Sequence, residues 1–173
     1  ALFGAFATLI FGKLSDMYGR RIMLLVSLIS ALAGSLLSIF STTFAFFIVA
    51  SAIRSLGIGA IMPLVFAVVG DMFPPVQRSK WIGMLQIPMG AAALFGPTLG
   101  GWFADGWGWQ YLFWSTALLF ILCLFLVPVG IPPLVHRGFK PKIDVRGCLL
   151  MMTATSTTII GISLGGVKYP WAS

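Results

Sequence analysis

Long apolar runs, each close to the length of a membrane-spanning helix, restrict what this chain can fold into. Five runs cover residues 22–40, 44–69, 80–102, 109–131 and 144–166, and short polar or charged stretches separate them. A helix needs about 20 apolar residues to cross a bilayer, and helices satisfy their own backbone hydrogen bonds in lipid. A further run over residues 1–11 is about half of a crossing. We therefore expect an all-α polytopic membrane protein built as a helical bundle.

The composition excludes a soluble domain and gives no sign of an enzyme. Hydrophobic residues make up 59% of the chain and charged residues only 9%, which is too little charge for a surface that faces water. Cys123 and Cys148 lie inside apolar runs, and the single histidine, His136, has no clustered ligands. We therefore expect no disulfide framework, no metal site, no cofactor and no catalytic nucleophile–base pair.

Lysine and arginine lie almost entirely on one side of the predicted spans. Nine of them follow the first, third and fifth runs or flank the adjacent helix ends: Lys13, Arg20, Arg21, Arg78, Lys80, Arg137, Lys140, Lys142 and Arg146. The opposite side holds Lys168. Because positively charged loops stay in the cytoplasm, we predict that stretches 12–21, 70–80 and 132–143 are cytoplasmic loops of a plasma-membrane or bacterial inner-membrane protein. The net charge of +7 then reflects topology, so we expect no nucleic-acid partner.

The charged stretch GKLSDMYGRR, residues 12–21, is expected to be the loop that joins the first two runs. Gly12 and Gly19 are expected to allow tight turning and close backbone approach, which a Cβ would obstruct. Asp16 is placed to accept hydrogen bonds from a helix N-terminus or to pair with Arg20. A turn that only sets topology would need neither Asp16 nor this glycine spacing.

Seven positions in this region closely resemble a motif of the major facilitator superfamily of secondary transporters. The motif, G-x-L-x-D-x-x-G-R-[KR]-x-x-L, lies between helices two and three of that family, and it is met here by Gly12, Leu14, Asp16, Gly19, Arg20, Arg21 and Leu24. The resemblance implies a major facilitator-type bundle with a conformational latch, formed by Gly12, Leu14, Asp16, Gly19, Arg20 and Arg21. The latch would hold one conformation through a charge-relay contact of Asp16 and Arg20 and release it in the other.

The resemblance also implies how the chain is divided. Residues 1–131 would be part of the N-terminal helical bundle, from the end of helix two through helix six. Residues 132–143 would be a cytoplasmic basic loop, and residues 144–173 would be helix seven and its outer exit. Asp144 is placed as the N-cap of that helix. Because the chain begins inside an apolar run, we expect it to be a piece of a longer protein. This piece would lack helix one and everything after helix seven.

Arg54 is the most informative single residue within a predicted span. It lies eleven residues after Thr43, about 16 Å along a helix and so near the middle of the membrane. A cation buried there marks a functional site, unless it is a structural residue paired with carbonyls or a carboxylate. Drug:proton antiporters of the superfamily often read R-x-x-Q-G-x-G on helix four. If Gly57 aligns with the last glycine of this pattern, Arg54 stands at the glutamine position, one helical turn from the position of the usual arginine. Arg54 could then play the role of that arginine or a different one.

A second motif, Gly96-Pro97-Thr98-Leu99-Gly100-Gly101, resembles the G-P-x-x-G-G signature on helix five of antiporters in this superfamily. Pro97 removes a helical donor and bends the axis, and the three glycines allow a neighbouring helix to pack closely. By analogy the motif favours an exporter, although close packing alone would explain the same residues.

Two shorter stretches resemble the fourteen-helix drug:proton antiporter subfamily. They are the W-x-x-x-F order that begins at Trp109 and the segment Asp144-Val145-Arg146-Gly147. An aromatic belt at the outer interface explains the cluster around Trp109 equally well.

Gln86 is a second candidate for transport, because an amide within a span can bond a substrate as well as a neighbouring helix. A proton-coupled carrier also needs an acid that titrates while it faces the cavity. The four acidic residues, Asp16, Asp71, Asp105 and Asp144, all lie in predicted loops or at helix ends. We therefore expect the coupling acid to lie outside this chain.

The resemblance to drug:proton antiporters implies a proton-coupled exporter of small amphipathic organic molecules or drugs, which would work by alternating access. Its partners would be the lipid bilayer, a small-molecule substrate and protons as the coupling ion. Two alternatives stay open: an uptake permease for a sugar or organic anion, with Arg54 as the anion ligand, and a membrane scaffold that transports nothing. The motif at residues 96–101 counts against the permease, and Arg54 and Asp16 count against the scaffold.

Overall fold

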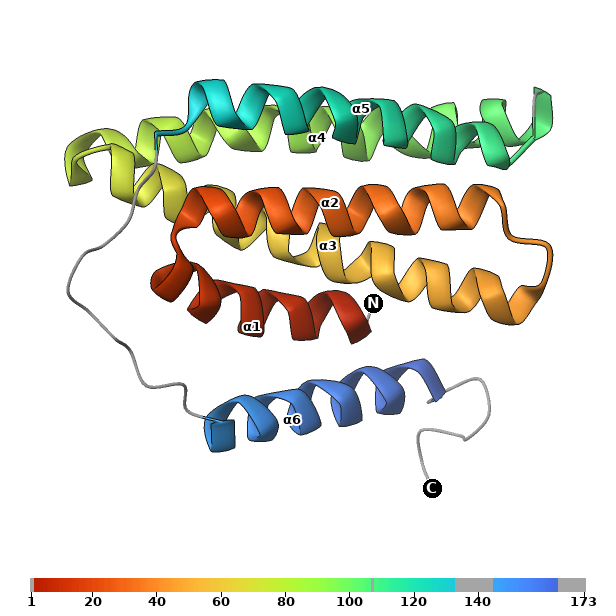
Figure 1. Cartoon of the computed structure of the whole chain (residues 1–173), viewed down its shortest axis with the longest axis horizontal. Helices are drawn as coiled ribbons and strands as arrows, with labels where there is room; N and C mark the ends of the chain where they lie inside the picture. Colours follow the sequence, from red (N-terminus) through yellow and green to blue (C-terminus); the bar gives the residue numbers. More distant parts are fainter. Residues whose placement is uncertain (1, 107, 133–144, 165–173) are drawn as a thin grey trace.

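The computed structural model describes residues 2–106, 108–132 and 145–164 and folds them into six helices (Figure 1). They are α1 (Leu2–Tyr18), α2 (Arg20–Ile39), α3 (Phe44–Met72), α4 (Pro75–Gly106), α5 (Gln110–Gly130) and α6 (Val145–Leu164). The described residues form no strand, which confirms the predicted all-α fold.

Four helical segments are long and apolar enough to cross a membrane: α2, α3, α5 and the part of α4 from Pro75 to Phe103. They coincide with the first four predicted spans. The predicted last span, 144–166, forms α6, but the apolar part of α6, Leu149–Ile162, is shorter than the other four segments. The chain is therefore a helical membrane bundle.

α1, α3 and α4 run longer at their ends than predicted, and two predicted loops are wrong. α1 continues through the predicted loop from Gly12 to Tyr18, so only Gly19 interrupts the helices there. α3 runs unbroken to Met72, and α4 begins at Pro75, so the predicted loop 70–80 shrinks to Phe73 and Pro74. A residue before proline avoids the helical region, and Phe73 is indeed extended, with φ −119° and ψ 141°. Pro75 restarts the helix because the fixed φ of proline suits a first helical position.

α2 and α3 form the centre of the bundle, and α1 and α5 pack on them (Figure 1). α1 lies against α3, α5 lies along α2, and α6 contacts α1. A buried apolar cluster joins the first three helices: Ala7, Met23, Leu24, Leu28, Ala60 and Leu64. α5 packs against this cluster through Phe120 and Leu124.

α2 crosses α3 where the backbone of Gly34 touches the backbone of Arg54. A Cβ atom added at Gly34 would lie only 2.6 Å from the Cβ atom of Arg54. Next to this crossing, the Ser30 hydroxyl donates to the Ile53 carbonyl at 3.2 Å. The crossing therefore depends on a residue without a side chain, and it determines where the backbone of Arg54 lies.

Candidate functional site

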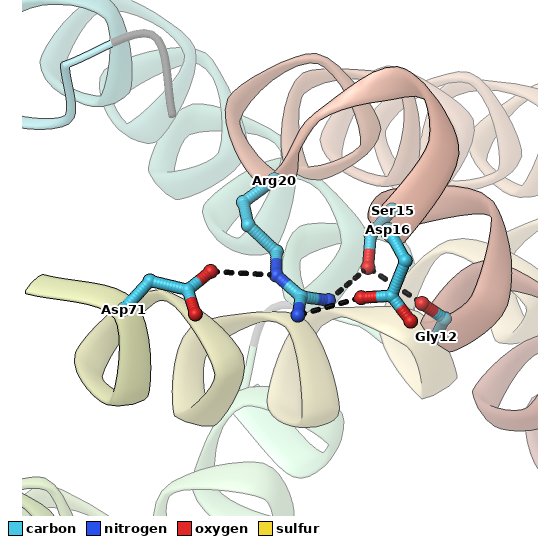
Figure 2. A network of polar contacts seen from close by, with 5 residues as sticks. All are labelled: Gly12, Ser15, Asp16, Arg20 and Asp71. Atoms are coloured by element: carbon cyan, nitrogen blue, oxygen red, sulfur yellow. Dashed lines mark hydrogen bonds and ion pairs between the residues drawn. The ribbon is translucent and has the colours of Figure 1, made fainter. Parts of the chain in front are cut away.

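A polar network surrounds Arg20, the first residue of α2, at the end of the bundle where α1 and α3 also finish (Figure 2). Its Nη2 atom forms an ion pair with Asp16 Oδ1 at 2.6 Å, and its Nε atom donates to Asp71 Oδ2 at 2.9 Å. Nη1 donates to Ser15 Oγ at 2.5 Å, and the Ser15 hydroxyl donates to the Gly12 carbonyl at 2.6 Å. One guanidinium thus connects α1, α2 and α3.

Gly19 makes this geometry possible because it turns the chain between α1 and α2 in a single residue. Its φ of 98° lies in a region that side chains with a Cβ rarely adopt. Its N–H donates to the Ser15 carbonyl at 3.0 Å, which completes α1, and its carbonyl accepts from Met23 N–H at 3.2 Å, which begins α2. The predicted role of Gly19 in tight turning is confirmed.

The network confirms one predicted pair and extends it. Asp16 and Arg20 pair as predicted, whereas Ser15 and Asp71 were not expected to join them. Asp71 lies 51 residues from Arg20, beyond the reach of local pattern analysis. The available signal was topological, since the start of one span and the end of the next lie on the same side of a membrane.

The other latch residues have different surroundings. Gly12 is helical, so the expected turn at Gly12 is wrong. A Cβ atom there would meet nothing within 4 Å among the described residues, so the expected close approach at Gly12 stays a prediction. Leu14 packs against the buried core cluster. Arg21 has no ion pair within the described ranges.

Partial exposure limits the energy of these ion pairs. The side chains of Arg20 and Asp71 are 16% and 19% exposed, and that of Asp16 is 46% exposed. Exposed pairs contribute about 0.2–1 kcal/mol each, and hydrogen bonds to charged groups about 1.5–3 kcal/mol. The network therefore stabilises one arrangement of three helices by at most a few kcal/mol.

Arg54 lies in the middle of α3, where its guanidinium stacks on the ring of Phe113 from α5. The Cζ atom is 5.1 Å from the ring centroid. The Nε atom is buried and has no hydrogen-bond partner in the part of the chain that the structure describes. A cation–π contact contributes about 0.5–2 kcal/mol, whereas an arginine at the centre of a membrane helix costs at least about 2.5–3.5 kcal/mol. Phe113 therefore offsets only part of this cost, which favours a functional reading of Arg54.

Three aromatic rings connect the start of α3 with the start of α5, next to Arg54. Phe47 meets Trp109 and Phe113 edge to face, with centroids 5.6 and 6.0 Å apart. A pocket of about 390 Å³ lies beside them, lined by Ser41, Thr42, Thr43, Phe44, Phe47 and Trp109. Trp109 and Phe113, from the aromatic cluster predicted around Trp109, thus both meet Phe47 of α3, and Phe113 is also the ring that faces the Arg54 guanidinium.

α4 carries the predicted helix-five motif on a surface without close neighbours. Its described residues from 75 to 103 include none that is buried. Cβ atoms added at Gly96, Gly100 or Gly101 would meet nothing within 4 Å there. Gln86 is exposed on the same helix. No helix of the described part packs closely on this motif, so its predicted packing partner stays a prediction.

Comparison with known proteins decides the family. The sequence profile described as Major Facilitator Superfamily matches residues 1–169. The chain belongs to this superfamily. Within it, the chain is 36% identical over 165 residues to multidrug resistance protein 3 of Bacillus subtilis, covering 95% of this chain and 32% of that protein. It is 30% identical to the multidrug transporter protein MdtP of the same species, covering 94% and 30% of the two chains.

A third relative is as similar to the chain as MdtP is. The efflux pump dotC of Dothistroma septosporum is 30% identical, with 99% of this chain and 30% of the pump covered. The chain thus spans about a third of the length of these curated relatives. The predicted resemblance to multidrug exporters of the superfamily is confirmed. The predicted basic loop at 132–143, the N-cap Asp144 and the outer exit at 167–173 lie outside the described residues, apart from Pro132.

Proposed function

We propose that the intact protein is a secondary transporter that exports small amphipathic organic molecules or drugs in exchange for protons. Membership of the superfamily supports transport, and relatives named for multidrug resistance and efflux support this substrate class. The observation that carries the proposal is the sharing of Arg20 between Asp16 and Asp71, because it joins three helices through contacts that can be broken.

Alternating access supplies the mechanism. In one state Arg20 holds the ends of α1 and α3 together, and in the other the bundle rearranges and the pairs separate. A substrate or proton shifts this equilibrium to the extent that it binds one state more tightly. Each pair contributes about 1 kcal/mol, so a modest difference in binding releases the latch. The stretches 12–21, 70–80 and 132–143 would face the cytoplasm of a plasma or bacterial inner membrane.

The same proposal assigns the rest of the chain. Residues 1–131 belong to the N-terminal bundle of a fourteen-helix antiporter, and residues 144–173 form helix seven with its outer exit. Arg54 and Gln86 take part in substrate binding or proton coupling. The glycines of the 96–101 motif receive a helix from outside the described residues. The titrating acid also comes from elsewhere in the intact protein, since Asp16, Asp71 and Asp105 lie at helix ends.

One observation favours a second function, the uptake of an organic anion. The buried Nε atom of Arg54 has no hydrogen-bond partner among the described residues, and a carboxylate of a substrate would supply one. In this case Arg54 would bind the substrate directly, and cations would not be transported.

The test is transport by the intact protein in liposomes under an imposed pH gradient, with a fluorescent lipophilic cation as substrate. Asp16→Asn, Asp71→Asn and Arg54→Ala are compared with Asp105→Asn, which removes a carboxylate from the end of α4. We expect gradient-driven export by the unmodified protein and by Asp105→Asn. We expect at least about a tenfold loss in Asp16→Asn, Asp71→Asn and Arg54→Ala, corresponding to about 1.4 kcal/mol.

A folded protein that moves no cation would overturn the export proposal. Uptake of a fluorescent organic anion that is lost in Arg54→Ala would then establish the second function. Full cation export by Asp71→Asn would remove the latch from the mechanism and leave transport itself in place.

A further inference from the structure

Pro63 leaves one carbonyl of α3 without its helical donor. It lies inside α3, and proline has no backbone N–H. In a regular helix the N–H of residue 63 would donate to the carbonyl of Gly59, four residues earlier. The Gly59 carbonyl must therefore find a donor elsewhere or remain unsatisfied in an apolar bundle, which is unfavourable.

Thr8 of α1 supplies this donor. Its hydroxyl lies 3.1 Å from the Gly59 carbonyl oxygen, across the interface between the two helices. The backbones of Gly4 and Gly59 touch beside this bond, since a Cβ atom at Gly59 would lie 2.5 Å from the Gly4 Cα atom. This close approach is what allows a side chain as short as threonine to reach the opposite helix.

The Thr8 hydroxyl has a second acceptor in its own helix. It lies 3.0 Å from the Gly4 carbonyl, four residues earlier. A hydroxyl carries one hydrogen, so the two acceptors share it or take it in turn. The Gly4 carbonyl has the backbone N–H of Thr8 as its regular helical donor, whereas the Gly59 carbonyl has lost its own. The hydroxyl is therefore needed at Gly59 and dispensable at Gly4.

This contact and the Arg20 network join the same two helices on either side of Pro63. Thr8 precedes Asp16 by eight residues, about 12 Å along α1. On α3, Gly59 lies before Pro63, and Asp71 lies at the far end of the segment that follows it. A change of bend at Pro63 would therefore move Asp71 relative to Arg20.

We propose that the Thr8 hydroxyl is a positioning group that caps the carbonyl freed by Pro63, sets the bend of α3 and so holds Asp71 against Arg20. Transfer of the hydroxyl to the Gly4 carbonyl releases this restraint. Thr8 then determines how readily the network at the helix ends opens, although it touches none of the charged residues.

A double-mutant cycle in the intact protein tests the proposal, and it needs no transport assay. Thr8→Val removes the hydroxyl at nearly constant shape, Thr8→Ser keeps it, and Pro63→Ala restores the helical N–H. We expect Thr8→Val to lower the melting temperature by about 1 °C, the effect of losing one hydrogen bond in a protein about three times the length of this chain. Thr8→Ser should stay close to the unmodified protein, and Thr8→Val should have little effect when combined with Pro63→Ala.

A distance measurement separates positioning from simple stabilisation. Tyr18 and Met72 are 59% and 40% exposed at the ends of α1 and α3, so Tyr18→Cys and Met72→Cys can carry spin labels after the native cysteines of the intact protein, Cys123 and Cys148 among them, are replaced by serine. We expect Thr8→Val to broaden or shift the distance distribution, and addition of Pro63→Ala to reverse this change. Equal effects of Thr8→Val with and without Pro63 would overturn the proposal. So would a lower melting temperature with an unchanged distance distribution.

Discussion

The Nε atom of Arg20 donates to Asp71 Oδ2 at 2.9 Å, although the two residues are 51 positions apart. Arg20 begins α2 and Asp71 stands next to last in α3, so this bond fastens the start of one membrane helix to the end of the next. Asp16 occupies another edge of the same guanidinium and adds α1 to the connection (Figure 2).

The first prediction concerns the energy of this bond. A double-mutant cycle with Arg20→Gln and Asp71→Asn should give a coupling energy of about 1 kcal/mol, because the pair is mostly but not fully shielded from solvent. The measurement is the free energy of unfolding of the intact protein in detergent micelles. The cycle of Arg20→Gln with Asp105→Asn is the control and should be additive within about 0.5 kcal/mol. Equal coupling energies in both cycles would show that the coupling comes from the overall charge of the protein and not from a specific bond between Arg20 and Asp71.

The second prediction separates the two glycines of the latch. Gly19→Ala should destabilise the protein by about 1–3 kcal/mol, because a residue with a Cβ atom is strained at φ 98° and ψ 141°. Gly12→Ala should be neutral or stabilising, since Gly12 is helical and a Cβ atom there meets nothing among the described residues. Thermal unfolding of both variants provides the comparison. A larger loss in Gly12→Ala than in Gly19→Ala would contradict this assignment.

The third prediction concerns the crossing of α2 and α3. Gly34→Ala should destabilise the protein by about 1–3 kcal/mol, because the added methyl group overlaps the backbone of Arg54. Gly70→Ala is the matched control: it lies in α3 with open space around its Cβ position and should stabilise by up to about 1 kcal/mol. If the two variants unfold alike, the crossing is looser than the structure indicates.

The fourth prediction separates function from stability at Arg54. Arg54→Met should leave the melting temperature unchanged or raise it, because the charge it removes has no ion-pair partner among the described residues and is costly in a membrane. Transport in liposomes should nevertheless fall at least about tenfold. Phe113→Leu removes the ring and not the charge, and it should lower the melting temperature slightly. A strong destabilisation of Arg54→Met with normal transport would make Arg54 a structural residue.

Local patterns predicted most of the fold, and the errors fell at helix ends. Run length placed α2, α3 and α5 closely, because about 20 apolar residues in lipid have few alternatives to a helix. Charge clusters were read as loops, which was wrong for Gly12–Tyr18 and for Pro75–Lys80. Charged residues at the end of a membrane helix reach water without leaving the helix, so polarity alone does not mark where a helix ends.

The candidate site shows the same division. Asp16 and Arg20 are four residues apart, and their pairing could be predicted because short spacing leaves little freedom. Asp71, Phe113 and the hydroxyl of Thr8 could not be assigned in this way, because their partners lie on other helices. Which residues meet across an interface depends on how far each helix is shifted and rotated against its neighbour.

Apolar length, charge placement and residue spacing are local properties, and they were enough to predict a helical membrane bundle of the major facilitator superfamily. The bridge from Arg20 to Asp16 and Asp71, the contact of Arg54 with Phe113 and the bond from Thr8 to the carbonyl freed by Pro63 were found only in the folded chain. These contacts depend on how the helices are placed against one another, and close backbone contacts at single glycines, such as Gly34 and Gly59, help to fix that placement.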